Sequence, residues 1–184
     1  INRKLRYFKS ILNEEDVDLL KELYVASVEY WDEQTGRLVE QLEESRDDVT
    51  IIITSDHGEL FGEHGGVGHP ERPWEELLRV PMIAYGDGIP QAEDHNVVQI
   101  ADVPATLAEL GGSSLNGRGD NLFDRSDRKG VLTVCSLTEP RFAYRTDEWK
   151  IVQGDNKTRL YDLPMSRPIK PTTTLPWSPD SKGN

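Results

Sequence analysis

Three of the four histidines of this chain fall within the thirteen residues from 57 to 69. At the start of this stretch, Asp56 and His57 stand side by side, two residues beyond the apolar run 49–53. A carboxylate oxygen and an imidazole nitrogen together suit a divalent ion such as manganese, zinc or, with further carboxylates, calcium. Asp56 and His57 are therefore candidate metal ligands. The alternative is an Asp-His-Gly turn in which the Asp56 side chain only satisfies nearby backbone groups.

The run 49–53 is β-branched throughout and is bounded by turn residues, which predicts a strand buried on both faces. Helical patterns flank it, so we expect a central parallel strand of an open α/β sheet. Such sheets bind ligands beyond the carboxyl ends of their strands, where Asp56 and His57 would lie. Neighbouring residues reach one ion only if the chain turns at 55–58, and Gly58 makes that turn easy.

The segment after this pair contains Glu63, His64 and a glycine-rich loop, 65–68, which ends at His69. Glycines allow the backbone to approach an anion closely, and successive amides there are able to hold one. We interpret Glu63 and His64 as loop residues with local hydrogen bonds, and His69 as a functional candidate. The chain lacks the G-x-x-x-x-G-K-[ST] signature, so a nucleotide-binding loop is not supported.

A long amphipathic pattern precedes the candidate site. Asn13 is suited to cap a helix whose first turn is acidic. Apolar residues then keep a three-to-four spacing over 17–42, which predicts one long helix packing on the sheet. Asp32 on this helix is expected to be a solvated residue rather than a ligand. The basic segment 1–12 is expected to be a connector.

Shorter elements follow the glycine-rich loop. We predict a short helix with Pro73 at its first position, a strand over 80–84, and a helix capped by Asp102 and ended by glycines 111–112. His95 lies in the polar loop between the last two elements and has no companion ligand nearby in the sequence, so we expect it to be exposed.

The composition changes after residue 112, where a polar, turn-rich stretch marks a predicted boundary. Strands are predicted beyond it, the last two forming a hairpin, at 131–136, 141–146, 149–153 and 159–163. We therefore predict an α/β region over 1–112, a small antiparallel subdomain over 113–163, and an extended or disordered tail over 164–184. Cys135 is expected to be a small strand residue.

Several strings along the chain occur in the order found in a known family. They are TSDHGELFGEHGG from 54, GH at 68–69, LLRVPMIAYG from 77, VVQIADVPATLAELGG from 97 and YRTDEWKIVQGDNKTRLYDL from 144. This order resembles the C-terminal part of sulfatases of the alkaline phosphatase superfamily, over roughly residues 20–165. The resemblance implies an α/β fold, an alkaline phosphatase-like sandwich of helices on a mixed sheet that is only partly contained here, with a small C-terminal antiparallel β subdomain.

The resemblance also implies roles for the candidate residues. Asp56 and His57 match the paired metal ligands of the family, which many sulfatases write as Asp-Asn and use to bind calcium. The Asp-His form is similar to phosphonate monoester hydrolases and to some lipoteichoic acid synthases, where manganese is common. One divalent ion, calcium or manganese, is therefore expected. His69 stands where many members have a lysine that contacts sulfate or phosphate oxygens, and a protonated histidine would do so less permanently.

The nucleophile of such enzymes is missing from this chain. Similar sulfatases carry C-x-P-x-R or S-x-P-x-R, whose cysteine or serine is oxidised to formylglycine, and neither motif occurs here. The resemblance therefore implies that the formylglycine lies in an N-terminal half of the same enzyme, outside this sequence. No histidine precedes His57, so the D-x-x-x-H motif of two-metal members is also absent and a one-metal enzyme fits better.

Three functions remain open from the sequence. The first is hydrolysis of a small sulfate ester or sulfated sugar by a metal-activated formylglycine. The second is a phosphonate monoester or phosphodiester hydrolase of the same superfamily, which shares these motifs. The third is a non-catalytic acidic fragment that retains the fold.

The charge of the chain excludes one class of partner. Lys and Arg number 21 against 33 Asp and Glu, giving a net charge of -12, so the surface repels nucleic acid. This acidity raises the hypothesis of adaptation to high salt, with an ordinary acidic surface as the alternative.

A single cysteine excludes an internal disulfide. No apolar stretch indicates a membrane function, the absence of a targeting signal slightly favours the cytoplasm, and the oligomeric state stays open.

Overall fold

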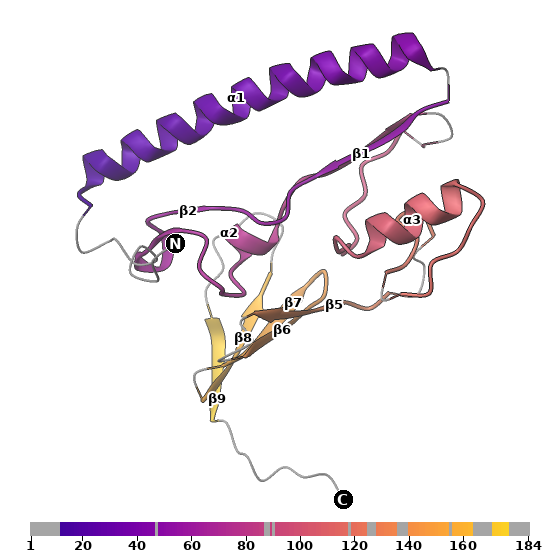
Figure 1. The fold of residues 1–184 in the computed structure, drawn as a ribbon. Coiled ribbons are helices and arrows are strands. Elements are labelled where there is room, and N and C mark those ends of the chain that lie inside the picture. The colour runs from indigo at the N-terminus through magenta and orange to yellow at the C-terminus, as the bar shows by residue number, and fades with distance from the viewer. Residues whose placement is uncertain are drawn as a thin grey trace, which may run out of the picture. The chain divides into compact units, whose positions relative to one another are not determined.

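The computed structural model describes residues 12–46, 48–86, 89, 91–117, 119–124, 128–135, 140–154 and 156–163, and the backbone of 171–176 (Figure 1). The chain divides into two compact units. The first comprises the chain up to Pro70 together with Trp74–Gln91, and the second comprises Glu71–Pro73 and the chain from Ala92 onward. Among the described residues, no helix combines the length and the apolar character needed to cross a membrane.

The first unit opens with α1 (Glu14–Ser45), a helix of 32 residues. Asn13 caps it as predicted, in a reciprocal arrangement with Asp16 in which each side chain accepts a hydrogen bond of 2.9 Å from the backbone amide of the other residue. The helix continues through Gly36, and Asp32 is exposed as predicted. The capping residue and the helical periodicity therefore predict this element correctly.

The apolar face of α1 is not covered by the described part of the chain. The helix touches β2 (Leu60–Phe61), where the Tyr24 ring meets the Phe61 ring edge-on at a centroid distance of 5.0 Å. None of its residues is buried. The prediction that the helix packs on the sheet is therefore wrong for the described residues. Its exposed large apolar side chains are Leu19, Leu20, Leu23, Tyr24, Val25, Val28, Tyr30, Trp31 and Leu38.

The strand that precedes the candidate site is β1 (Thr50–Thr54), and it pairs antiparallel with β4 (Met82–Gly86). These two strands form a sheet of their own, and all five residues of β1 are half-buried. The prediction of a central parallel strand buried on both faces is therefore wrong for the described residues, because β1 meets a single neighbour. β4 begins later than predicted since Pro81 lacks an amide hydrogen to donate to the ladder.

Short elements complete the first unit. They are β2, the 3-10 helix η3 (Glu63–Gly65), β3 (Val67–Gly68) and α2 (Glu75–Leu78). β2 and β3 pair antiparallel as a small hairpin, and Leu60 and Leu77 are buried. The helix predicted from Pro73 begins later, with Trp74 as its N-cap residue.

The second unit contains α3 (Asp102–Leu110) and an antiparallel sheet of five strands. In spatial order these are β5 (Val131–Cys135), β6 (Arg141–Arg145), β7 (Trp149–Gly154), β8 (Lys157–Asp162) and β9 (Pro171–Pro176). The predicted antiparallel C-terminal sheet is confirmed, as is the 149–163 hairpin, whose turn residue Asn156 has φ 55°. Cys135 is a half-buried strand residue as predicted, and burial raises the pKa of its thiol.

Within the predicted extended or disordered tail, β9 is extended and pairs with the edge of β8. An unpaired edge strand offers backbone donors and acceptors that an extended segment readily takes up. The remaining residues of the predicted tail lie outside the described residues, and so does the predicted connector except for Leu12.

The prediction that Asp102 caps α3 is also wrong. Ala101 is the N-cap residue, and Asp102 is fully buried inside the first turn. Its carboxylate accepts hydrogen bonds of 3.0 Å from the amides of Gln99 and Asp120, and it forms an ion pair with Arg128. The residue therefore joins α3 to the polar stretch that follows it. Gly112, with φ 72°, ends the helix as expected.

Candidate metal centre

The chain turns after β1 and brings Asp56 and His57 beside α2. Gly58 donates its amide hydrogen to the Leu77 carbonyl at 2.9 Å, which anchors this turn. A Cβ atom at Gly58 would lie 1.9 Å from the Glu76 carbonyl oxygen, so this close approach admits glycine alone. The turn expected from the sequence is therefore present.

His57 is held so that one particular ring nitrogen is available. Its Nδ1 lies 2.9 Å from the Gly58 carbonyl oxygen. A carbonyl oxygen only accepts, so Nδ1 carries the hydrogen and the neutral ring presents the lone pair of Nε2. A histidine that ligates a metal is oriented by a hydrogen bond of this kind.

The carboxylate of Asp56 faces that free nitrogen. Asp56 Oδ2 lies 3.6 Å from His57 Nε2, while Oδ1 accepts the His57 amide hydrogen at 3.0 Å. Two donors bound to one ion at about 2.0–2.6 Å each are separated by about 3–4 Å. The pair therefore fits a single divalent ion, and the exposed fraction of the Asp56 side chain, 86%, leaves its oxygen open to solvent.

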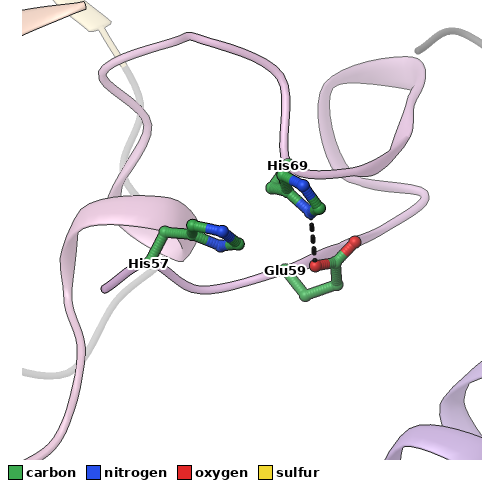
Figure 2. A group of neighbouring side chains, drawn as sticks. All are labelled: His57, Glu59 and His69. Carbon is green, nitrogen blue, oxygen red and sulfur yellow. Dashed lines mark hydrogen bonds and ion pairs between the residues drawn. The ribbon is translucent and has the colours of Figure 1, made fainter. Parts of the chain in front are cut away.

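The β2–β3 hairpin brings His69 to the same place. The pairing of Leu60 with Gly68 puts Glu59 opposite His69 at the open end of the hairpin. His69 Nδ1 donates to Glu59 Oε2 at 3.0 Å, and the His69 ring stacks on His57 at a centroid distance of 4.2 Å and an interplanar angle of 26° (Figure 2). His57 and His69 were both candidates from the sequence, whereas Glu59 was not.

Donor atoms of His57, Glu59 and His69 all lie within 4.8 Å of one another. These three side chains form the only such metal-type group among the described residues. However, lone pairs of imidazole nitrogens lie in the ring planes, so two nearly parallel stacked rings do not point at a common ion. Both Nδ1 atoms are also engaged in hydrogen bonds. The geometry therefore suits the pair Asp56 and His57 better than the group of three.

The glycine-rich loop does not provide the predicted anion site. The amides of Gly65 and Gly66 donate within the loop, to the carbonyls of Gly62 at 3.2 Å and Glu63 at 3.0 Å. Gly68 belongs to β3 and pairs with Leu60. The amides of Gly65 and Gly66 are therefore directed into the turn of the hairpin.

Glu63 and His64 make the local contacts expected from the sequence. Glu63 accepts the Phe61 amide hydrogen at 2.6 Å. The His64 ring stacks on Trp74 at 4.2 Å, and its Nε2 lies 3.1 Å from a Glu76 carboxylate oxygen. Both residues therefore hold the hairpin in place. His95 is exposed as predicted.

A family model described as Sulfatase matches residues 7–113, which is more than half of the chain. The chain belongs to the sulfatase family. Members of this family generally use a divalent metal ion and formylglycine. Choline-sulfatase from Rhizobium meliloti (strain 1021) is 36% identical over 106 residues, an alignment that covers 56% of this chain and 20% of that protein.

Two solved structures share the fold. Phosphonate monoester hydrolase SpPMH from Silicibacter pomeroyi has a TM-score of 0.69 at 19% identity, over 84% of this chain and 37% of that chain. BT4656, solved in complex with its substrate D-glucosamine-2-N,6-O-disulfate, has a TM-score of 0.63 at 24% identity, over 76% and 33%. These likenesses confirm the predicted alkaline phosphatase-like fold. The chain spans about a fifth of choline-sulfatase and about a third of each of these two structures.

Glu59 is the site residue that sequence reasoning missed. The strands that align it with His69 are two residues long, too short to produce a period-two pattern. The one signal was the run of glycines between the two residues, since Gly62, Gly65 and Gly68 all adopt positive φ. In this sulfatase a turn-rich segment between an acid and a histidine therefore indicated a hairpin.

Proposed function

We propose that this chain is the metal-binding C-terminal part of a sulfatase that hydrolyses sulfate esters. The proposal rests on one observation in a chain of the sulfatase family. Beyond the end of β1, Asp56 Oδ2 lies 3.6 Å from His57 Nε2, so both atoms are able to bind one ion. The formylglycine nucleophile is proposed to lie in an N-terminal part of the same protein, because neither nucleophile motif occurs in this sequence. The substrate is proposed to be a small sulfate ester or sulfated sugar.

Each residue of the site has a proposed role. Asp56 and His57 hold the ion, and when bound the ion supplies charge that stabilises the ester oxygens and activates the nucleophile. An imidazole donor favours manganese over calcium, which prefers oxygen ligands throughout. The protonated form of His69 donates its Nε2 hydrogen to an ester oxygen, since Nδ1 is bonded to Glu59.

The uncovered apolar face of α1 agrees with this proposal. A large exposed apolar surface on a single chain indicates a region that another segment covers. We propose that the N-terminal part of the protein covers α1 and the open edges of the β1–β4 sheet.

Comparing substrates tests the proposed reaction. The full-length protein is expected to hydrolyse p-nitrophenyl sulfate with a higher kcat/KM than bis-p-nitrophenyl phosphate or a phosphonate monoester. Steady-state release of p-nitrophenol measures all three. Faster turnover of the phosphorus esters would reject sulfate hydrolysis as the main activity. It would support the second candidate, a phosphonate monoester or phosphodiester hydrolase, which the Asp-His pair and the likeness to SpPMH favour.

We also propose that the acidic surface is an adaptation to high salt. The Debye length is about 3 Å at about 1 M salt and rises to about 10 Å at about 0.1 M. At the lower salt concentration, repulsion among the acidic side chains of this chain, whose net charge is -12, therefore acts over longer distances. Dialysis from about 1 M to about 0.1 M salt is therefore expected to unfold the protein. Circular dichroism in the helical band measures this loss of helix. An unchanged spectrum would favour the ordinary acidic surface instead.

A further inference from the structure

We infer that Glu59 is a positioning residue that acts through His69, an assignment that rests on the proposed function of this site. The inference starts from the register of the small hairpin. Leu60 pairs with Gly68, so Glu59 and His69 are the next pair along the two strands. Leu60 is fully buried and fixes this register. The side chains of Glu59 and His69 consequently leave the hairpin together, next to His57 (Figure 2).

The contact between the two side chains selects one orientation of the ring. His69 Nδ1 lies 3.0 Å from Glu59 Oε2, and an ionised carboxylate only accepts hydrogen bonds. Nδ1 therefore carries a hydrogen and faces Glu59, which leaves Nε2 directed elsewhere. Stacking on His57 at 4.2 Å restricts the ring plane. Two constraints together thus determine where Nε2 points.

The hairpin is built to keep Glu59 in place. The Glu59 side chain is 24% exposed, compared with 58% for His69, so the carboxylate is the more enclosed partner. Gly68 has φ 87°, which favours glycine, and a Cβ atom there would make an ordinary contact of 3.5 Å with Glu59 Oε1, so the carboxylate lies close against this strand. A hydrogen bond of 2.8 Å from the Gly62 amide to the Gly66 carbonyl closes the turn.

The competing assignment makes Glu59 a metal ligand together with His57 and His69. The two assignments differ in what removal of the carboxylate does. A lost ligand lowers the amount of bound metal, whereas a lost positioning residue leaves the metal in place and slows turnover. Orienting residues of this kind are typically worth about 10- to 100-fold.

A double-mutant cycle on the full-length enzyme separates these assignments, with p-nitrophenyl sulfate as substrate, or whichever ester the wild type hydrolyses. Glu59→Ala is expected to lower kcat/KM by about 10- to 100-fold. In the His69→Ala background the same change is expected to have no further effect, because Glu59 acts only through His69. Manganese content, measured by elemental analysis, is expected to stay at the wild-type value in both variants.

Further variants complete the cycle. Glu59→Gln retains a neutral acceptor for Nδ1–H and is expected to restore most of the rate. The matched controls are the single variants Glu93→Ala and His95→Ala. These two residues form an exposed carboxylate–histidine pair at 3.9 Å outside the site, and both variants are expected to show wild-type kinetics. Losses that add in the double variant, loss of manganese in Glu59→Ala, or a Gln variant as slow as Ala would each overturn the assignment.

A second measurement keeps the inference testable if the proposed function fails. Should the wild type hydrolyse neither sulfate nor phosphorus esters, two-dimensional NMR of the full-length protein labelled with ¹⁵N-histidine still reports which ring nitrogen of His69 carries hydrogen. The inference predicts hydrogen on Nδ1, and a changed His69 signal in Glu59→Ala with an unchanged His95 signal. A His69 signal that does not respond to Glu59→Ala would refute the inference without reference to activity.

Discussion

Asp56→Ala is expected to remove the bound divalent ion from the full-length enzyme and to lower kcat/KM for a sulfate ester by roughly 10³-fold. The ion supplies several kcal/mol of transition-state stabilisation in metal-dependent hydrolysis, and about 1.4 kcal/mol corresponds to a factor of ten in rate. Asp56 provides the only charged donor of the proposed pair, since His57 binds as a neutral imidazole. Removing it leaves only the neutral ring nitrogen of the proposed pair, which binds the ion much more weakly.

Steady-state kinetics and elemental analysis of the purified variant measure both effects. Asp48→Ala is the matched control, because Asp48 is an exposed aspartate of the same unit that forms an ion pair of 3.4 Å with Arg46. It is expected to keep the wild-type metal content and rate. Full metal content in Asp56→Ala would instead identify Asp56 as a turn residue that bonds the His57 amide, and would favour the non-catalytic reading of the chain.

Much of the fold follows from local signals in the sequence. Asn13 and the acidic turn after it predict where α1 begins, and the strand patterns predict four strands of the C-terminal sheet. The turn at 55–58 was also predictable, because Gly58 is the residue that a close backbone approach demands. These features depend on residues near one another in the chain, so their types and spacing are sufficient.

Other features depend on partners that the sequence does not reveal. The apolar run of β1 predicted burial on both faces, yet the strand meets only β4 in the described chain. Its composition agrees with a buried strand, and the proposed N-terminal part would supply the missing neighbours. The pairing of Glu59 with His69 was hidden for a different reason, since strands of two residues carry no periodic pattern.

Asp102 illustrates the same limit within the second unit. Its position before Pro104 predicted a cap, a local role that aspartate commonly has. Its partner Arg128 lies 26 residues away, within a stretch whose polar composition suggested only a boundary. The structure instead shows that this stretch folds back, with the Leu122 amide donating to Thr106 Oγ1 at 2.8 Å in the buried interior.

Disrupting this buried ion pair is expected to have the largest effect on stability. Arg128 Nη2 lies 2.7 Å from Asp102 Oδ1, and its Nη1 bonds the second carboxylate oxygen. The exposed fractions are 8% for the Arg128 side chain and 0% for Asp102. Asp102→Ala is expected to lower the free energy of unfolding by about 3 kcal/mol, because it leaves two backbone amides without their acceptor and leaves the buried guanidinium only the exposed carboxylate of Asp120.

The same carboxylate makes the stability depend on pH. Burial alone would raise the pKa of Asp102, but the hydrogen bond from Arg128 and those from the amides of Gln99 and Asp120 outweigh it and lower the pKa below its ordinary value of 3.8. The folded state therefore binds this proton less readily than the unfolded state does. The contribution of Asp102 is complete above the unfolded pKa and is lost as the pH falls through the lower, folded pKa.

Urea denaturation of the full-length protein, followed by tryptophan fluorescence, measures the loss. Asp124→Ala is the matched control. Asp124 is an exposed aspartate in the same polar stretch, and its removal is expected to change the free energy of unfolding by less than about 0.5 kcal/mol.

Arg128→Met is expected to destabilise the protein as well. The variant carrying both Asp102→Ala and Arg128→Met is expected to lose less than the sum of the single losses, because each single change already breaks the shared pair. Fully additive losses, or an Asp102→Ala variant as stable as Asp124→Ala, would mean that the pair contributes little and that α3 and the polar stretch are joined chiefly through Thr106.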